Sequence, residues 1–198
     1  MVYQKKDFYF YEAKKKNYAA RSVFKLEEIN QKFRILKGGD QVLDLGAAPG
    51  SWSQYTSDKI GPKGRILGID LEEVKLTLPN AIFLTKDIND LNLDEEIKKY
   101  ELKSHFDVIL SDMAPKTTGI RTTDQVRSFE LCELGFVTAT RFLKPKGHFV
   151  CKLFHSEAFE QFRSTLKKSF TKVEVLRPKS TRKESKEIFL IALQFSSK

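Results

Sequence analysis

The sequence contains little cysteine and little histidine. Its two cysteines, Cys132 and Cys151, are far apart and have no Cys-x-x-Cys spacing, so they indicate neither a disulfide framework nor a zinc site. The three histidines, His105, His148 and His155, also lack the spacing of metal ligands. We therefore expect no bound metal, and we expect both cysteines to be buried thiols.

Long apolar segments are absent as well. No run of about 18 apolar residues occurs, and the first residues lack the apolar segment of a secretory signal. We expect a soluble, cytoplasmic monomer with no membrane contact, or a protein of the mitochondrion or another organelle if the host is eukaryotic. With no internal repeat, residues 1–198 are predicted to form one domain, comprising a basic arm and helix (1–37) and a core (38–198).

Positive charge is concentrated near the two ends of the chain. The net charge is +9, from 35 Lys and Arg against 26 Asp and Glu. Residues 1–37 and residues 167–186 each carry a net charge of +6, whereas residues 38–166 are slightly acidic. A nearly neutral core with two basic flanks is typical of a small-molecule fold that also binds a polyanion. The alternative is that this charge only keeps the protein soluble.

Alternating strands and helices are predicted along the first part of the core. After a helix over residues 17–33, four short apolar runs read as strands, and each has an aspartate near its carboxyl end. The strands are Gln41–Leu45, Arg65–Ile69, Ala81–Leu84 and Phe106–Leu110, with Asp44, Asp70, Asp87 and Asp112 at or after their ends. Helical stretches at about 51–60 and 94–100 lie between them. This alternation indicates a parallel sheet.

The second part of the core predicts a reversed strand. Apolar residues at steps of three and four indicate one long helix over 124–143, with Phe129, Cys132, Phe136, Ala139 and Leu143 on its buried face. A strand over Gly147–Leu153 and a helix from Ser156 to about Lys168 follow. The final runs, Lys172–Leu176 and Ile188–Gln194, are too close for a crossover helix and should pair antiparallel. We predict an α/β, Rossmann-like fold: a mostly parallel seven-stranded sheet, its last strand antiparallel, with helices on both faces.

A loop suited to a nucleoside follows the first strand of the core. In Asp44-Leu-Gly-Ala-Ala-Pro-Gly-Ser-Trp52, Gly46 and Gly50 leave room for a ligand at a helix N-terminus. Asp70 can accept hydrogen bonds from ribose hydroxyls, and Asp87 from an exocyclic amine. The loop lacks the second glycine of Gly-x-Gly-x-x-Gly, which admits a pyrophosphate, so S-adenosylmethionine fits better than a dinucleotide. Asp44 could equally fix the loop, and Trp52 could equally be a core aromatic.

Four charged residues are predicted to meet at one edge of the sheet. Because the last strand is reversed, its first residue, Glu187, should lie beside the carboxyl ends of the parallel strands, near Asp112 and Lys152. Lys25 comes from the N-terminal helix. No aromatic follows Ser111-Asp-Met-Ala-Pro115, which disfavours a planar amine as methyl acceptor. A hydroxyl acceptor needs a base, and a lysine can serve as one.

These segments resemble the FtsJ/RrmJ heat-shock ribosomal RNA methyltransferases over nearly the whole chain. The segments that carry the resemblance are Ala20–Leu26, Asp44–Gly50 with Trp52–Tyr55, Asp107–Pro115, Val150–Phe154, and Pro178–Arg182 with Ser185–Glu187. The resemblance implies a catalytic tetrad of Lys25, Asp112, Lys152 and Glu187, in which Lys152 accepts the proton. It implies S-adenosylmethionine as the cofactor, leaving S-adenosylhomocysteine, with contacts from Gly50, Trp52, Asp70, Asp87 and Asp112. The sequence departs from the family's usual residues at Ser51 and Lys116.

The resemblance also implies the substrate. This would be a uridine ribose 2′-hydroxyl in the A-loop of large-subunit ribosomal RNA, within the large ribosomal subunit. Alternatives are a transfer-RNA anticodon-loop ribose, a non-catalytic RNA-binding assembly factor, and a dinucleotide oxidoreductase. The aromatic and lysine residues of Asp7–Lys16 could either bind RNA or anchor the N-terminal arm to the core.

Overall fold

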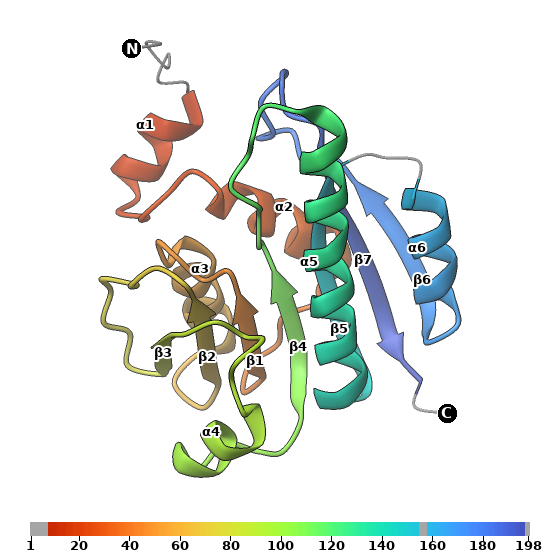
Figure 1. Cartoon of the computed structure of the whole chain (residues 1–198). Helices are drawn as coiled ribbons and strands as arrows, with labels where there is room; N and C mark the ends of the chain where they lie inside the picture. Colours follow the sequence, from red (N-terminus) through yellow and green to blue (C-terminus); the bar gives the residue numbers. More distant parts are fainter. Residues whose placement is uncertain (1–7, 155–157, 197–198) are drawn as a thin grey trace.

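The computed structural model describes residues 8–154 and 158–196 and contains one seven-stranded sheet with helices on both faces (Figure 1). The strand order is β3-β2-β1-β4-β5-β7-β6, and β7 runs antiparallel to the other six strands, which are parallel to one another. The predicted fold class is confirmed. The elements are α1 (Phe8–Lys15), α2 (Val23–Phe33), β1 (Gln41–Leu45), α3 (Ser51–Ile60), β2 (Arg65–Asp70), β3 (Ala81–Thr85), α4 (Leu93–Lys99), β4 (Phe106–Ser111), α5 (Arg121–Phe142), β5 (Leu143–Phe154), α6 (Ala158–Lys167), β6 (Phe170–Leu176) and β7 (Glu187–Phe195).

Each face of the sheet has its own apolar core. Helices α4, α5 and α6 cover one face, where Phe106, Phe149 and Leu153 are fully buried. Helices α2 and α3 cover the other face, where Val150, Phe189 and other buried side chains pack. All five residues of the central strand β1 are buried, as expected for a strand covered on both sides. The predicted apolar face of α5 packs into the first of these cores.

The reversed strand brings its first residue to the carboxyl edge of the parallel strands. In the register of β5 with β7, Glu187 lies opposite Phe154 and Phe189 lies opposite Lys152. Directly opposed residues in an antiparallel pair place their side chains on the same face. Lys152 therefore extends from the face that α2 covers, as Phe189 does. The predicted position of Glu187 at this edge is confirmed.

The helix predicted over residues 17–33 was too long, because α2 begins only at Val23. Asn17 has a left-handed backbone (φ 57°), which interrupts a helix. The Gln54 side chain of α3 accepts a hydrogen bond from the Ala19 amide (2.7 Å) and donates one to the Asn17 carbonyl (3.1 Å). These tertiary bonds stabilise an extended turn where the sequence pattern indicated helix.

The start of β5 also differs from the prediction. Strand β5 begins at Leu143, whereas the sequence predicted a turn before Gly147. This turn is an irregularity inside β5: the pairing with β4 shifts in register between Phe106, which pairs with Leu143, and Val108, which pairs with His148. Ser156, the predicted cap of α6, lies outside the described residues. Within the two described ranges, no helix is long and apolar enough to cross a membrane.

Candidate active site

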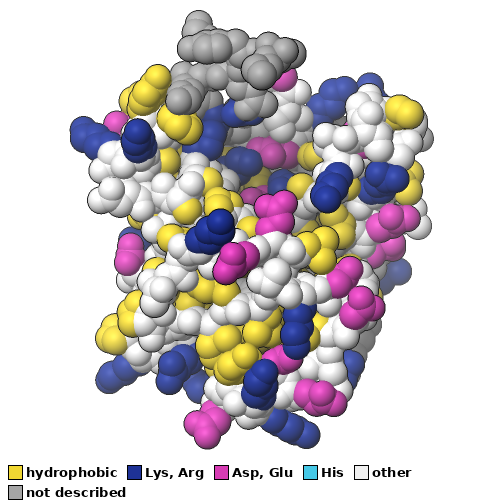
Figure 2. Space-filling view, turned by 60° about the vertical axis from the view of Figure 1, so that its left-hand side comes forward, with side chains coloured by type: hydrophobic (Ala, Val, Ile, Leu, Met, Phe, Trp, Pro, Cys, Tyr) yellow, Lys and Arg dark blue, Asp and Glu magenta, His cyan; other side chains and the backbone are white. Residues whose placement is uncertain are grey.

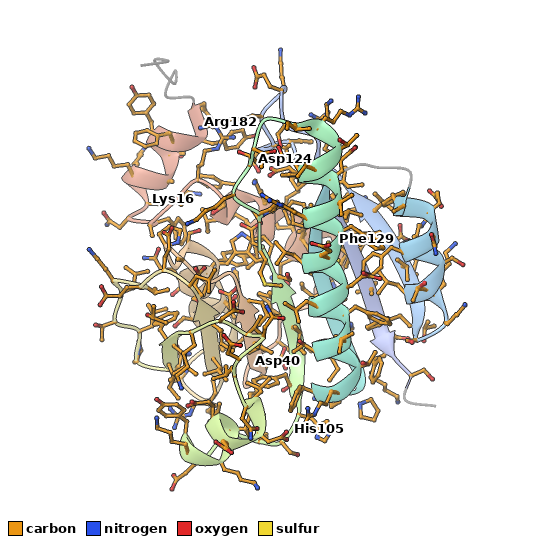
Figure 3. The ribbon with its side chains drawn as sticks, in the orientation of Figure 1. Lys16, Asp40, His105, Asp124, Phe129 and Arg182 are labelled. Carbon is orange, nitrogen blue, oxygen red and sulfur yellow. The ribbon has the colours of Figure 1, made fainter. Side chains whose placement is uncertain are left out.

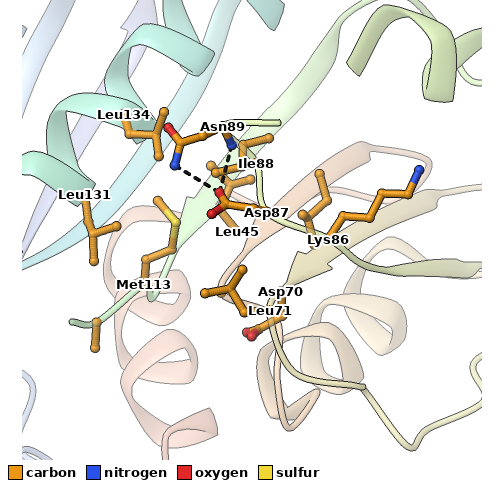
Figure 4. Close-up of a pocket in the computed structure, with 13 residues that line it drawn as sticks. Leu45, Asp70, Leu71, Lys86, Asp87, Ile88, Asn89, Met113, Leu131 and Leu134 are labelled. Carbon is orange, nitrogen blue, oxygen red and sulfur yellow. Dashed lines mark hydrogen bonds between the residues drawn. The ribbon is translucent and has the colours of Figure 1, made fainter. Parts of the chain in front are cut away.

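A pocket opens at the carboxyl ends of β1, β2 and β4. Its volume is about 170 Å³, and its walls are mostly aliphatic. Acidic side chains lie on one side, and residues of α5 close the other (Figure 4). An apolar slot with a few oriented polar groups is the usual form of a site for a flat heterocycle. The lining residues include Leu45, Gly46, Ile69, Asp70, Asp87, Met113, Leu131 and Leu134.

The two aspartates of the pocket are held in place by local hydrogen bonds. Asp70 accepts bonds from the backbone amides of Ala48 (2.8 Å) and Glu72 (2.9 Å), one on each carboxylate oxygen. Asp87 accepts two bonds from Asn89, from its backbone amide and its side-chain amide, both 2.9 Å (Figure 4). Each carboxylate oxygen can accept more than one bond. Both carboxylates can therefore also accept hydroxyl or amine donors from a nucleoside.

At the two glycines of the loop after β1, the space that a side chain would fill is occupied by other residues of this protein. Gly46 has a positive φ (76°), and a Cβ there would lie 2.8 Å from the Met113 amide nitrogen. Gly50 has φ 104°, and a Cβ there would collide with the side chain of Leu76. The close approach at both positions is made by protein, and only Gly46 of the two also lines the pocket.

Asp44 is a buried carboxyl beneath this loop, with an exposed fraction of 1%. Its Oδ2 accepts a hydrogen bond from the Ser53 hydroxyl (2.6 Å), whereas its Oδ1 has no partner among the described residues. Burial, together with the nearby carboxylates of Asp112 and Asp70, raises the pKa of Asp44 to about 7, although the Ser53 bond opposes this rise. The structure favours the loop-fixing interpretation of Asp44.

The Lys152 ammonium group lies at the end of β4, where Asp112 binds it twice. Its Nζ donates to the backbone carbonyl of Asp112 (2.6 Å) and to its carboxylate Oδ1 (2.8 Å). Only 8% of the Lys152 side chain is exposed, so a charge there requires such partners. The Cys132 thiol of α5 donates to the Lys152 backbone carbonyl (2.8 Å). Contacts at both ends of the residue thus fix its position.

A second ion pair lies beside the first. Lys25 of α2 binds Glu187 at the start of β7, with Nζ and Oε1 2.5 Å apart and each side chain 12% exposed. The Lys25 Nζ also lies 5.9 Å from the ring centre of Phe189, which is the cross-strand partner of Lys152. The structure therefore brings all four predicted charged residues to one edge of the sheet.

Trp52 and Asp112 do not line the pocket. The Trp52 indole is buried, donates to the Ser22 carbonyl (2.9 Å) and packs 5.7 Å from the Phe189 ring. It behaves here as a core aromatic that ties α3 to α2 and β7. Asp112 instead faces Lys152, next to the pocket residue Met113.

Sequence reasoning missed the wall of the pocket that α5 supplies. Leu131 and Leu134 line it, three residues apart on the helix and outside its predicted core face. The presence of apolar residues on a second face of this amphipathic helix was the signal that could have predicted this wall of the pocket. Asn89, which orients Asp87, followed no pattern that the sequence alone could reveal.

Basic residues from both ends of the chain lie near the same edge. Lys16 and Arg182 lie toward the upper end of the molecule, whereas Asp40 and His105 lie at the opposite end (Figure 3). Figure 2 shows acidic and basic side chains within a hollow at this upper end. Arg21 binds the carbonyl of Ser180, and burial together with the charge of Arg182 lowers the pKa of its guanidinium. The two basic flanks of the sequence thus meet beside the charged cluster.

A mostly parallel seven-stranded sheet with a reversed β7, and a pocket with two oriented carboxylates at the carboxyl ends of β1, β2 and β4, define an S-adenosylmethionine-dependent methyltransferase. The oriented carboxylates of Asp70 and Asp87, which line the pocket, are chemically suited to the hydroxyl and amine groups of that cofactor. The described residues contain no cluster of three or more His, Cys, Asp or Glu side chains able to hold a metal ion.

The sequence matches the family of FtsJ-like methyltransferases over residues 18–195, and the chain belongs to this family. It is 60% identical over 193 residues to the ribosomal RNA large subunit methyltransferase E of Bdellovibrio bacteriovorus, covering 98% of each chain. It is 46% identical over 190 residues to the protein of the same name from Desulfatibacillum aliphaticivorans, covering 94% of this chain and 89% of that one. Family membership removes the dinucleotide oxidoreductase alternative.

Solved structures agree with this assignment. A protein from Plasmodium falciparum described as a ribosomal RNA methyltransferase superposes with a TM-score of 0.80 at 28% identity, over 91% of this chain and all of that one. Fibrillarin from Aeropyrum pernix, with natively bound S-adenosylmethionine, gives a TM-score of 0.52 at 20% identity, over 80% of this chain and 68% of that one. At that identity, the likeness to fibrillarin shows the fold alone.

Proposed function

We propose that this protein transfers a methyl group from S-adenosylmethionine to a ribose 2′-hydroxyl of large-subunit ribosomal RNA. The observation that carries the proposal is the buried Lys152, bound twice by Asp112 beside the pocket and adjacent to the Lys25–Glu187 pair. The relatives named as ribosomal RNA large subunit methyltransferases support the choice of RNA. We further propose a uridine of the A-loop, within the assembled large subunit, as the site.

The acceptor hydroxyl has to lose its proton as its oxygen attacks. When bound, S-adenosylmethionine supplies an electrophilic methyl group on a sulfonium, which leaves as a neutral thioether. The oxygen–methyl bond would form as the sulfur–methyl bond breaks, and the hydroxyl proton would pass to the Nζ of Lys152, whose ammonium group must first have released one proton to water. A neutral amine has two N–H donors and one lone pair. With both donors directed at the carbonyl and carboxylate of Asp112, the lone pair of Lys152 is left for the hydroxyl proton.

Lys25 and Glu187 complete the arrangement as an ion pair on the same face of the sheet. Glu187 neutralises Lys25 and fixes its ammonium group at 2.5 Å, and Lys25 orients the incoming ribose by donating a hydrogen bond. We assign Lys25 and Asp112 to orientation, Lys152 to proton removal and Glu187 to holding the lysine. The cofactor would be held by the pocket residues Gly46, Asp70 and Asp87, with Asp112 and the loop residue Gly50 beside them, and Trp52 would support this loop from the core.

The RNA backbone would bind along the basic flanks that border this edge. A cleft next to Glu187 is lined by Arg121, Arg177, Lys183 and Lys186, and phosphates are the groups that such a cluster attracts. The bacterial relatives named above support a location in the cytoplasm. We propose that the protein acts there as a monomer.

The test is methyl transfer from labelled S-adenosylmethionine to a panel of RNAs. We expect label in large ribosomal subunits, less in naked ribosomal RNA and none in free transfer RNA. The matched control is Lys98→Met, at an exposed lysine of α4 outside the basic flanks, which should act like the natural protein. Label in transfer RNA instead would replace the substrate with the anticodon loop, and a protein that binds subunits without transferring label would be an assembly factor.

A further inference from the structure

Helix α1 carries aromatic side chains that the proposed chemistry does not use. Phe8, Phe10 and Tyr11 have exposed fractions of 69%, 36% and 59%. Phe8 and Tyr11, three residues apart, lie on one face of the helix, which we call the aromatic face of α1, whereas Phe10 lies on another side of it. Three large rings at the surface of one short helix are a costly arrangement in water, because apolar area favours burial. Such a surface is typical of a site that a partner covers.

The helix itself is held firmly to the core by its other side. Tyr9 packs against Phe24 of α2 with ring centres 5.5 Å apart, and Ala13 is buried. Residues four apart lie on one face of a helix, so Tyr9 and Ala13 together anchor it. Anchoring to the core, one of the two alternatives for this segment, is thus the role of Tyr9 and Ala13. RNA binding, the other alternative, would involve different residues of the same helix.

The aromatic face of α1 adjoins the edge that carries the charged cluster. The guanidinium of Arg21 lies 5.6 Å from the ring centre of Tyr9 and also donates to the carbonyl of Ser180. Ser180 belongs to the basic segment 177–186, which leads directly into Glu187. In Figure 1, α1 lies at the same end of the molecule as the loops that follow β4 and precede β7. A strand of RNA with its target ribose at Lys152 would pass close to α1.

The charge of this helix suits a polyanion. Lys14 and Lys15 lie in its last turn with Lys16 directly after it, and its first turn has no acidic residue. Lysines beside exposed aromatic rings are the combination that binds single-stranded nucleic acid, in which unpaired bases stack on rings and phosphates bind the cations. We propose that the aromatic face of α1 stacks unpaired bases next to the methylated nucleotide, with Lys14 and Lys15 bound to their phosphates. This inference rests on the proposed function.

An unpaired RNA segment explains the surface better than other apolar partners. A lipid surface or a second copy of the chain seated on α1 would cover the edge at which the substrate ribose has to enter. A stacked RNA strand, in contrast, would occupy α1 and the charged cluster in the same binding event. The three lysines add attraction for RNA, whereas they would repel a second copy of this basic chain.

The test compares Phe8→Leu/Tyr11→Leu with the unchanged protein. Leucine keeps the helix and the apolar character but has no ring face on which a base can stack. We expect the KM for ribosomal RNA to rise about tenfold, which corresponds to 1.4 kcal/mol, while affinity for S-adenosylmethionine stays unchanged. A single-stranded RNA carrying 2-aminopurine should lose fluorescence on binding the natural protein and lose much less with the variant. Val137→Ala, at an exposed apolar residue of α5, is the matched control and should change neither result.

Equal KM values and equal quenching for the natural protein and the double variant would overturn the inference, with methyl transfer itself intact. Binding to anionic phosphatidylglycerol vesicles, or self-association, that is lost in the variant without any change in RNA binding would also overturn it. If no RNA is methylated at all but quenching still depends on the two rings, the proposed function fails and base stacking on α1 stands.

Discussion

Replacing Asp44 by Asn should change how the stability of the protein depends on pH. The Asp44 carboxyl is buried, and its pKa is raised from 3.8 to about 7. The folded state therefore retains a proton that the unfolded state has lost between these two values. Because the folded state binds more protons there, the free energy of unfolding that Asp44 contributes is present at low pH and falls as pH rises toward 7.

The size of this effect follows from the two pKa values. Between about pH 5 and about pH 8, the natural protein should lose roughly 2–3 kcal/mol of unfolding free energy through Asp44. Asparagine has nearly the same shape, its carbonyl can still accept the Ser53 hydroxyl, and it does not ionise. Relative to the natural protein, the free energy of unfolding of Asp44→Asn should therefore increase by this amount as pH rises.

The assay is urea unfolding of both proteins at several pH values without added cofactor. Only the difference between the two proteins is used, because other groups titrate equally in both. Asp90→Asn, at an exposed carboxyl, serves as the control and should follow the natural protein. Parallel curves for Asp44→Asn and the natural protein would refute the reasoning, since Asp44 would then ionise normally in the fold.

Three further changes have defined outcomes. Lys152→Met should lower kcat at least 100-fold, which is the scale of lost general base catalysis. Calorimetry should show that its affinity for S-adenosylmethionine is nearly unchanged. Near-normal turnover of this variant would exclude Lys152 as the proton acceptor. Gly46→Ala places a Cβ 2.8 Å from the Met113 amide nitrogen at a residue with positive φ. It should lower the free energy of unfolding in urea by about 2–4 kcal/mol. An unchanged urea midpoint would contradict this and show that the loop can adjust to the extra methyl group. Burial and the charges of two nearby lysines lower the pKa of His148 to about 4. The free energy of unfolding that His148 contributes should therefore be fully present above pH 6.5 and should fall as pH drops toward 4. If the free energy of unfolding of His148→Gln depends on pH as steeply as that of the natural protein, this reasoning is wrong.

The parallel strands, the reversed last strand and the edge that carries the charged residues could be predicted because they follow from local pattern and chirality. Apolar runs define strands, a short gap forces an antiparallel pair, and the position of Glu187 at the carboxyl edge is then a matter of topology. Lys152 interrupts the apolar run Phe149–Phe154, where a buried ammonium group requires a partner, and the structure supplies Asp112 as that partner.

What could not be predicted depends on contacts between distant residues. The start of α2 is set by Gln54, a side chain of another helix, which no local pattern reveals. The sequence left Trp52 open between core and cofactor, and only packing against Phe189 places it in the core. The aromatic residues of α1 divide between anchor and surface according to where α2 lies.

The most direct test of the central claim is the chemical position of the transferred methyl group. A methyl on the ribose 2′-oxygen removes the hydroxyl that attacks the neighbouring phosphate, so that linkage resists alkaline hydrolysis. After reaction with labelled S-adenosylmethionine and large subunits, we expect the label in an alkali-stable dinucleotide, and we expect none when Lys152 is replaced by Met. Label recovered in mononucleotides, as from a methylated base, would contradict the assignment of Lys25, Asp112, Lys152 and Glu187 to a ribose hydroxyl.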